Sequence, residues 1–417
     1  MKPMKALDDY DLMSKEFQEE SFEFYERLQK EAPVYNMPGT DVYLVSRFDD
    51  IKAISLDPAT FSNNLSYGMI QGERWKLYQD ILESRGWGIK RVLNGADLPE
   101  HRRVRKYLDS VLNARNVEAL KPRIQEVTDM LIDRFIDRGE CDFMREFAFQ
   151  LPSLIIAEHL GFDPDNIENF LRWATTTSRI TNHVLSEEEL RECAEAELEM
   201  QHYLHEVMEQ RKRSPGSDLL SRIVIENSGE NVDNQPLTEQ ELQNVLRDVI
   251  TGGFGTVINM LGNSLYLLLT HPEQMAKLRA NPDLMKNFVE ESLRMDTSIA
   301  VFPRITTREV EMHGVTIPKG ALIGLCLSGA NHDPSKFACP HAFDIERQGA
   351  GSHITFNFGP HTCPGRLLAK MELQIAFSTI LRRIEDIELA EDLPNPHMAN
   401  WRHRNIERLP IRFRRAR

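Results

Sequence analysis

The stretch "FNFGPHTCPGRLLAK", residues 356–370, places a single cysteine among two glycines, two prolines and a histidine, directly ahead of a helical pattern. Backbone N–H groups at a glycine-bearing turn and at the start of a helix stabilise a thiolate and lower the pKa of the thiol. The glycines also let the backbone approach a flat or bulky group closely. Three interpretations therefore remain open for Cys363: a buried structural thiol, a nucleophile activated by His361, or a ligand for a metal.

The composition sets limits on the class of protein. The chain has 417 residues, of which 41% are hydrophobic and 27% are charged, and this is enough for a large core. A formal net charge of -14 argues against binding to nucleic acid through a general electrostatic field. We expect no membrane association, because the sequence has no run of about 18 apolar residues and no apolar signal segment at its start.

The five cysteines are scattered, and no two of them have the spacing of a zinc or iron–sulfur site. A reducing cytoplasm is therefore the expected location.

Helical periodicity dominates the first two thirds of the chain. Clear amphipathic helices are predicted over 21–33, 99–113, 116–139 and 186–214, and a longer helix, with apolar residues all round, over 238–274. Thr238 and Glu241, three residues apart, form a capping-box pattern at the start of this long helix.

Strand-like segments lie mainly in the last third, where 309–314 and 315–320 alternate around a glycine and predict a hairpin. No internal repeat and no linker rich in Gly, Ser or Pro divides the sequence. We therefore expect one mainly α-helical domain with small β-sheets, covering residues 1–417.

Two adjacent glycines, Gly252 and Gly253, lie inside the predicted long helix. Each costs about 1 kcal/mol relative to alanine in a helix interior. The pair therefore predicts either a functional distortion of the helix or a place where another element packs closely against it.

The cysteine stretch resembles the haem-binding loop of the cytochrome P450 superfamily, whose pattern is Phe-x-x-Gly-x-His/Arg-x-Cys-x-Gly. The matching residues are Phe356, Gly359, His361, Cys363 and Gly365. Asn357 stands where the family often has a further glycine. The resemblance implies the P450 fold, with haem b buried between the long central helix and the helix after the cysteine. It also implies that the Cys363 thiolate is the axial ligand of the iron, where it favours O–O cleavage.

Other segments follow the family's order. Glu291 and Arg294 in "EESLRM" match its Glu-x-x-Arg pair, and Arg347 would complete a buried ion network that folds the protein and seats the haem. The resemblance also implies partners for the two haem propionates, which need cationic or hydrogen-bonding groups. These partners are His101, Arg105, Arg304 and His361.

The segment "ITGGFGTVINMLGN" is similar to the oxygen-activating helix of the camphor-hydroxylase type of bacterial member. The resemblance assigns Gly252 and Thr256 to the catalytic stretch, but Gly255 stands where the family usually has Asp or Glu. Loss of a positioned proton-transfer group typically costs about 10²–10⁴-fold in rate. We expect either an altered water relay, for which Asp248 is a candidate, or chemistry that needs less proton delivery.

The resemblance implies a monooxygenase that uses O2 to hydroxylate, epoxidise or dealkylate a small hydrophobic substrate. The chain ends soon after the haem helix, so we expect electrons from a separate ferredoxin and an NAD(P)H-dependent ferredoxin reductase. Five cations are candidates for a patch that docks an acidic ferredoxin: Arg102, Arg103, Lys106, Arg366 and Lys370. Because of Gly255, a peroxygenase-like enzyme and a non-oxygenating haem-thiolate enzyme remain alternatives.

The segments expected to face the substrate contribute Tyr67, Trp75, Trp87, Trp173, Ile299, Val301, Phe302 and Trp401. Such a lining suits an apolar small molecule. Arg402 and His403 are candidates for contact with an acidic or hydroxylated substrate.

Overall fold

The structure is a computed structural model that describes residues 5–65, 72–163, 166–182, 185–216, 218–228 and 235–416. Backbone contacts divide the chain into two compact units. Unit 1 comprises residues 1–63, 121–151 and 256–417, and unit 2 comprises residues 64–120 and 152–255. In the described ranges, no helix is long and apolar enough to cross a membrane.

Among the residues that the structure describes, the strands all lie in unit 1, and its largest sheet has the strand order β1-β2-β8-β5-β3. In this sheet β2 and β8 are parallel and the other pairs are antiparallel. A second sheet has the order β4-β10-β9, and β6 pairs with β7. The strands are β1 (Val34–Asn36), β2 (Val42–Val45), β3 (Phe61–Ser62), β4 (Glu140–Asp142), β5 (Val301–Thr306), β6 (Val310–Met312), β7 (Val315–Ile317), β8 (Leu322–Cys326), β9 (Ile384–Leu389) and β10 (Pro410–Arg415).

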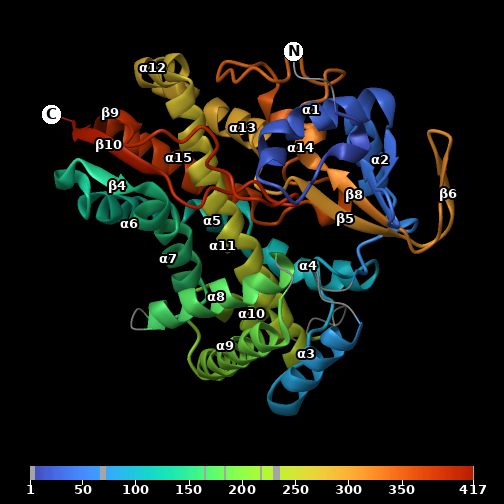
Figure 1. Cartoon of the computed structure of the whole chain (residues 1–417). Helices are drawn as coiled ribbons and strands as arrows, with labels where there is room; N and C mark the ends of the chain where they lie inside the picture. Colours follow the sequence, from blue (N-terminus) through green and yellow to red (C-terminus); the bar gives the residue numbers. More distant parts are fainter. Residues whose placement is uncertain are drawn as a thin grey trace. The chain divides into compact units, whose positions relative to one another are not determined.

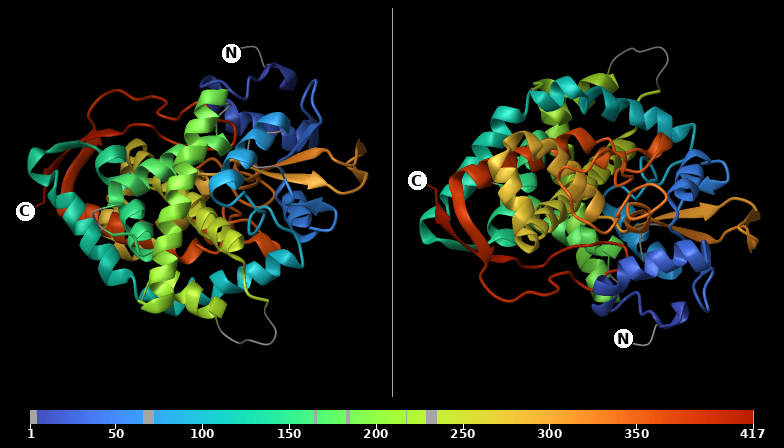
Figure 2. Two further views of the ribbon diagram at one scale, coloured as in Figure 1. Left: turned by 90° about the horizontal axis from the view of Figure 1, so that it is seen from below. Right: turned by 90° about the horizontal axis from the view of Figure 1, so that it is seen from above.

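The predicted hairpin is confirmed as β6 and β7, which extend away from the five-stranded sheet in Figure 2. Helices α1 and α2 lie beside this sheet in Figure 1, and the short α14 contacts both of them. The helices of unit 1 are α1 (Glu16–Glu31), α2 (Phe48–Leu56), α6 (Lys121–Asp133), α12 (Pro272–Ala280), α13 (Met285–Met295), α14 (Leu327–Ala330) and α15 (Arg366–Arg383).

Short helical turns complete unit 1: η1 (Leu7–Asp9), η2 (Ile136–Arg138), η3 (Met144–Ala148), η5 (Pro282–Leu284), η6 (Ala350–Ser352) and η7 (Gly359–His361). Its apolar core includes Val45, Ile323, Leu325 and Ile354 around the sheet.

Unit 2 is helical in its described parts, and α9 packs against α3, α8 and α10. One apolar cluster joins Tyr78 and Leu82 of α3 to Ile180 of α8 and Leu190 of α9. Its helices are α3 (Gly72–Arg85), α4 (Glu100–Val111), α5 (Ala114–Glu118), α8 (Ile167–Asn182), α9 (Glu187–Arg213) and α10 (Leu219–Ser228). The helix predicted over 116–139 is wrong in extent, because it is divided into α5, α6 and η2.

Two helices pass from one unit into the other, α7 (Gln150–His159) and α11 (Glu239–Thr270). α11 confirms the predicted long helix. Its predicted capping box is also present: the Glu241 amide donates to the Thr238 hydroxyl at 3.3 Å, and the Thr238 amide donates to the Glu241 carboxylate at 2.9 Å. The helix is continuous through Gly252 and Gly253.

Candidate functional site

The backbone of the cysteine loop is fixed by two residues with left-handed dihedrals, Asn357 (φ 60°) and Gly359 (φ 71°). Glycine and asparagine adopt this conformation most readily, which explains why Asn357 can replace the family's glycine. The Asn357 carboxamide oxygen accepts hydrogen bonds from the Ser55 hydroxyl (2.9 Å) and the Phe358 amide (2.8 Å). A Cβ on Gly359 would lie 2.7 Å from the Ser55 carbonyl oxygen, so a side chain there would displace the loop from α2.

Cys363 lies at the end of this loop with a half-buried side chain. Its amide donates to the Phe356 carbonyl at 2.9 Å, which closes the loop, and Arg366 donates to its carbonyl at 3.1 Å. Helix α15 begins at Arg366, three residues after the cysteine. The positive end of the α15 dipole is therefore two to three residues from the thiol, where it favours a thiolate. A Cβ on Gly365 would lie 3.9 Å from the Cys363 sulfur.

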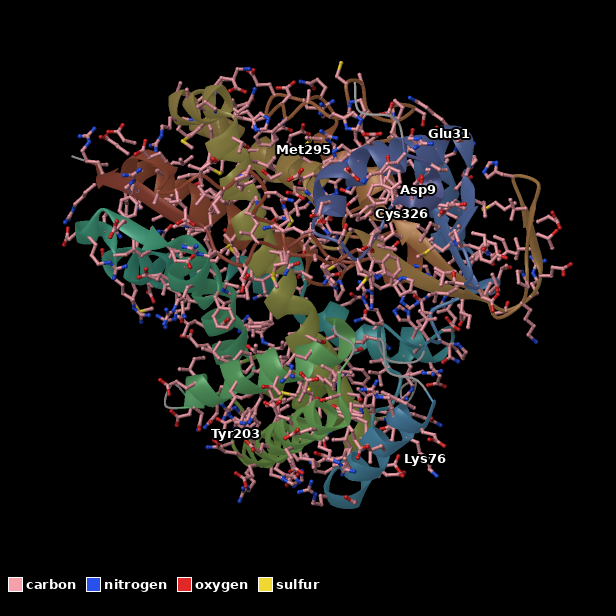
Figure 3. The ribbon with its side chains drawn as sticks, in the orientation of Figure 1. Asp9, Glu31, Lys76, Tyr203, Met295 and Cys326 are labelled. Atoms are coloured by element: carbon pink, nitrogen blue, oxygen red, sulfur yellow. The ribbon has the colours of Figure 1, made fainter. Side chains whose placement is uncertain are left out.

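The other cysteines have different surroundings. Cys141, Cys193 and Cys326 are buried, and Cys326 lies among side chains of α1 (Figure 3). Burial raises the pKa of Cys193 to about 11 and raises those of Cys141 and Cys326 as well. These three thiols are therefore held in the neutral form, and Cys339 is exposed on the surface.

A half-buried carboxylate supports the loop from α13. Glu290 accepts from Lys370 of α15 at 2.7 Å and lies 3.1 Å from the His353 ring nitrogen Nε2. The Lys370 ammonium also lies 5.3 Å from the centre of the Phe356 ring. These contacts tie α13, α15 and the loop together on both sides of Phe356.

The predicted Glu-x-x-Arg pair has no solvent exposure and forms an ion network with the partly exposed Arg347. Arg294 donates to both carboxylate oxygens of Glu291, at 2.8 and 2.9 Å, and Arg347 donates to Glu291 at 2.9 Å. Both arginines also donate to backbone carbonyls of the 331–342 segment. The network therefore fixes the chain that leads toward the cysteine loop.

The candidate propionate partners in unit 2 are His101 and Arg105, one turn apart on α4. His101 is buried, and burial, followed by the charge of Arg105, lowers its pKa to about 4. Its imidazole is therefore neutral near pH 7 and suited to donate a single hydrogen bond. Arg105 donates to Asp109 at 2.7 Å, and this ion pair joins successive turns of α4.

The candidate propionate partners in unit 1 are Arg304 and His361. Arg304 lies on β5 with 1% of its surface exposed, its guanidinium 5.0 Å from the Phe302 ring centre. It donates to the Pro303 carbonyl at 2.8 Å. His361 ends η7, and its Nε2 atom is buried. Both side chains thus present cationic or hydrogen-bonding groups in surroundings of low polarity, which suits a carboxylate.

Helix α11 has an open stretch in an otherwise buried run. Gly252 is exposed, and Gly255 and Thr256 are half-buried, whereas Leu242 to Asp248 are all buried. A Cβ at Gly252 or Gly255 would meet no atom within 4 Å. Side chains therefore leave this face of α11 uncovered, and a flat, bulky group requires such a face. The half-buried thiol of Cys363 is a suitable iron ligand. Both features fit haem.

Gly253 has the opposite environment. Its Cβ would lie 2.4 Å from the Cδ1 atom of Ile156, so close packing against α7 accounts for this glycine. Of the two explanations for the glycine pair, packing therefore applies to Gly253.

Helix α11 makes two further polar contacts that were not predicted from the sequence. The Asp248 carboxylate accepts from the Asn94 amide at 3.3 Å, within unit 2. In unit 1, Asn259 donates to the Ser298 hydroxyl at 2.9 Å, which links α11 to the segment before β5. The contact of Asn259 with Ser298 was not predicted, because the two residues are far apart along the chain.

A second residue missed from the sequence is Glu372 on α15. It is 2% exposed, and its Oε2 atom has no hydrogen-bond partner among the described residues. Burial raises the pKa of this carboxyl to about 8. The sequence signal that could have identified Glu372 is its position, because this glutamate interrupts the apolar face of the helix.

The proposed docking cations are partly neutralised. Arg103 forms ion pairs with Glu100 and with the buried Glu241, and Lys370 is paired with Glu290. Lys90 also binds Glu241. Burial alone would raise the pKa of Glu241, but the contacts with Lys90 and Arg103 lower this pKa to about 2. Arg103 therefore has a structural partner and is a poor choice for testing a docking surface.

Several predicted substrate contacts belong to packed interiors. Trp173 is buried and donates to Glu199 at 2.8 Å, and Val301 is also buried. Trp87, in contrast, is half-buried and lies over His205, with ring centres 5.3 Å apart. Tyr67 lies outside the described residues. The half-buried Ile299, Phe302 and Trp401 remain candidates.

Within the described ranges, no group of three or more His, Cys, Asp or Glu side chains is arranged to hold a metal ion. A single protein ligand such as Cys363 is compatible with an iron whose other ligands come from a porphyrin.

Comparison with known proteins identifies the family. The sequence profile described as "Cytochrome P450" matches residues 165–401. Cytochrome P450 107B1 of Saccharopolyspora erythraea is 33% identical over 401 residues, which cover 93% of this chain and 94% of that protein. The 6-deoxyerythronolide B hydroxylase of the same organism is 32% identical, with 97% and 98% covered.

The fold agrees with the sequence relationship. The P450 heme domain of Tepidiphilus thermophilus superposes with a TM-score of 0.89 at 29% identity, covering 97% of both chains. The predicted mainly α-helical fold with small sheets is thus confirmed. This chain therefore belongs to the cytochrome P450 family and is a P450 monooxygenase.

Proposed function

We propose that this protein binds haem b through the Cys363 thiolate and uses O2 to hydroxylate, epoxidise or dealkylate a small, largely apolar molecule. The observation that carries the proposal is the loop ahead of α15. A half-buried thiol lies there at the positive end of a helix, whereas the thiols of Cys141, Cys193 and Cys326 are buried and neutral. When bound, the haem supplies the iron centre at which O2 is reduced and one oxygen atom passes to the substrate.

The protein holds the cofactor at two kinds of site. Cys363 provides the anionic iron ligand, and the open backbone of Gly365 beside the sulfur leaves room for the porphyrin face. His101, Arg105, Arg304 and His361 are the proposed partners of the propionates. Phe356 packs against Lys370 and His353 and so orients the loop that carries the thiolate.

The proposed proton route follows α11. Asp248, Gly252 and Thr256 are spaced by four residues and therefore form one stripe along the helix, about 12 Å long from end to end. The open space at Gly252 and Gly255 gives room for water between the Asp248 carboxylate and the Thr256 hydroxyl. In this route the threonine orients the last water, and the aspartate replaces the carboxylate that Gly255 lacks.

Electrons are proposed to come from a ferredoxin and an NAD(P)H-dependent ferredoxin reductase in the cytoplasm. The exposed Arg102, Lys106 and Arg366 are the remaining candidates for charge-guided docking.

Carbon monoxide difference spectroscopy tests the ligand assignment. Cys363→Ser should abolish the red-shifted Soret band of thiolate-ligated haem, because a hydroxyl does not replace the sulfur anion. Cys339→Ser, which alters an exposed cysteine, is the matched control and should leave the band intact. An unchanged band in Cys363→Ser would exclude the proposed ligand.

A second experiment separates the monooxygenase from the peroxygenase-like alternative, which the glycine at position 255 favours. The compound giving the largest spin-state shift in a panel of apolar molecules is supplied with NADH, ferredoxin and reductase, or with hydrogen peroxide alone. Asp248→Asn should slow the O2 reaction by about 10²-fold and leave the peroxide reaction nearly unchanged, because peroxide brings its own protons. Equal wild-type turnover with peroxide alone would favour the alternative.

A further inference from the structure

A charged pair lies beside Phe356, the aromatic residue at the start of the cysteine loop. The Lys370 ammonium donates to the Oε1 atom of Glu290 at 2.7 Å and lies 5.3 Å from the centre of the Phe356 ring. Phe356 is joined to the residue that carries the thiol, because its carbonyl accepts a hydrogen bond from the Cys363 amide at 2.9 Å. Only Phe356 therefore links the charged pair to the proposed iron ligand in this chain of contacts.

A histidine holds the second oxygen of the same carboxylate. The Nε2 atom of His353 lies 3.1 Å from the Oε2 atom of Glu290, and its Nδ1 atom accepts from the Thr355 amide at 3.3 Å. An imidazole that accepts at Nδ1 carries its proton on Nε2 and is uncharged. Burial also lowers the pKa of His353, although the contact with Glu290 opposes this shift. His353 therefore fixes the carboxylate in place without adding a charge.

The charged pair is only partly screened by solvent, because the side chains of Lys370 and Glu290 are 23% and 12% exposed. Burial alone would raise the pKa of Glu290, but the hydrogen bonds from His353 and Lys370 lower it, so the carboxylate is charged near neutral pH. Arg294, whose charge also acts on His353, is paired with Glu291. Glu290 and Lys370 thus place one negative and one positive charge beside the loop.

Charges at such a place act on electron transfer. Reduction of a haem iron adds one electron and makes the centre more negative by one charge. A neighbouring cation favours this change and a neighbouring anion opposes it, more strongly in partly desolvated surroundings than in water. The groups around an iron ligand are therefore a means by which a protein sets the reduction potential.

We propose that Lys370 and Glu290 set the reduction potential of the iron bound to Cys363 with opposite signs, so that Lys370 favours the reduced state and Glu290 opposes it. The step concerned is the one-electron reduction of the iron by the ferredoxin, in which no bond forms or breaks. This inference rests on the proposed function, because it concerns the iron for which Cys363 is the proposed ligand.

Reduction potentials of the haem-bound protein test the assignment. They are measured by anaerobic spectroelectrochemical titration at about pH 8, where His353 is uncharged, in saturating imidazole, which holds every variant in the low-spin state. Lys370→Gln should lower the equilibrium constant for reduction about threefold to tenfold, and Glu290→Gln should raise it by a similar factor. A tenfold change corresponds to about 59 mV for one electron.

The signs of the two shifts separate an electrostatic role from a structural one. If the pair only held the loop in place, both substitutions would loosen the same loop and shift the potential in the same direction. The double variant Glu290→Gln/Lys370→Gln removes both charges and should return close to the wild-type potential. Lys370→Arg keeps the cation and should also stay close to it. Because Lys370 is partly exposed, its two variants test the inference even without a folded Glu290→Gln protein.

The ion pair of Lys277 with Glu346 provides the matched control. Its atoms are also 2.7 Å apart and it too joins separate segments of unit 1, but its side chains are 45% and 54% exposed. Lys277→Gln should therefore leave the potential unchanged. Shifts of the same sign in Glu290→Gln and Lys370→Gln, or a wild-type potential in Lys370→Gln, would overturn the inference.

The carbon monoxide spectrum of each variant separates this result from the proposed function. An intact thiolate band with unshifted potentials defeats only the role assigned to Lys370 and Glu290. Absence of the band in the wild-type protein defeats the haem-thiolate proposal on which that role rests.

Discussion

Gly253 and Gly255 lie two positions apart on α11, but a methyl group would have different effects at each. At Gly255 it would meet no atom within 4 Å, so Gly255→Ala should gain up to about 1 kcal/mol of helix stability. At Gly253 it would lie 2.4 Å from Cδ1 of Ile156, the free end of a side chain that would have to rotate away, so Gly253→Ala should gain less stability than Gly255→Ala. Urea unfolding of the two variants measures the difference, and equal changes in stability would contradict it.

Single residues also show what a sequence pattern can and cannot predict. The loop pattern predicted Gly359 and Cys363 because each meets a local requirement, a left-handed dihedral in one case and a thiolate at a helix start in the other. The pairing of Arg103 with Glu241 was not predictable in the same way, because it joins α4 to the start of α11 across a long stretch of chain.

At the scale of elements, α15 carries a destabilising charge that pH should reveal. The pKa of Glu372 is about 8 in the folded protein and near its ordinary value of 4.5 when unfolded. Between these values the folded protein binds more protons than the unfolded chain, so the free energy of unfolding falls as pH rises. Glu372→Gln should flatten this decline and add on the order of 2 kcal/mol near the upper end of the range.

Denaturant unfolding across the pH range checks this expectation. Glu388→Gln on β9 is the control, since that side chain is 68% exposed and should change the slope little. A slope that persists in Glu372→Gln would show that another group causes it.

Elements differ in how well their sequences predicted them. α11 and the β6–β7 hairpin depend on local periodicity and a glycine turn, and both were predicted. The parallel pairing of β2 with β8 joins segments from opposite ends of the chain, and local propensity carries no information about it. The break between α5 and α6 was also missed, because the helical pattern of residues continues through it.

At the scale of the whole molecule, the path of the chain supports a single catalytic domain over residues 1–417, which stays a prediction. Neither compact unit is a continuous stretch of sequence: the chain passes between them repeatedly, twice inside a helix. Composition shows no linker between the units. It could not predict the units themselves, because they are defined by non-local contacts.

The ion network around Glu291 has a consequence for recombining this chain with its relatives. Arg347 satisfies Glu291 and the carbonyls of Ala338, Cys339 and Ala342 at once, and Arg294 reaches Asn331 and Pro340. A crossover placed between residues 294 and 347 would combine the Glu291 carboxylate of one parent with backbone carbonyls whose positions are set by the other parent. Chimeras should therefore inherit residues 291–347 as one block, with exchange points outside it.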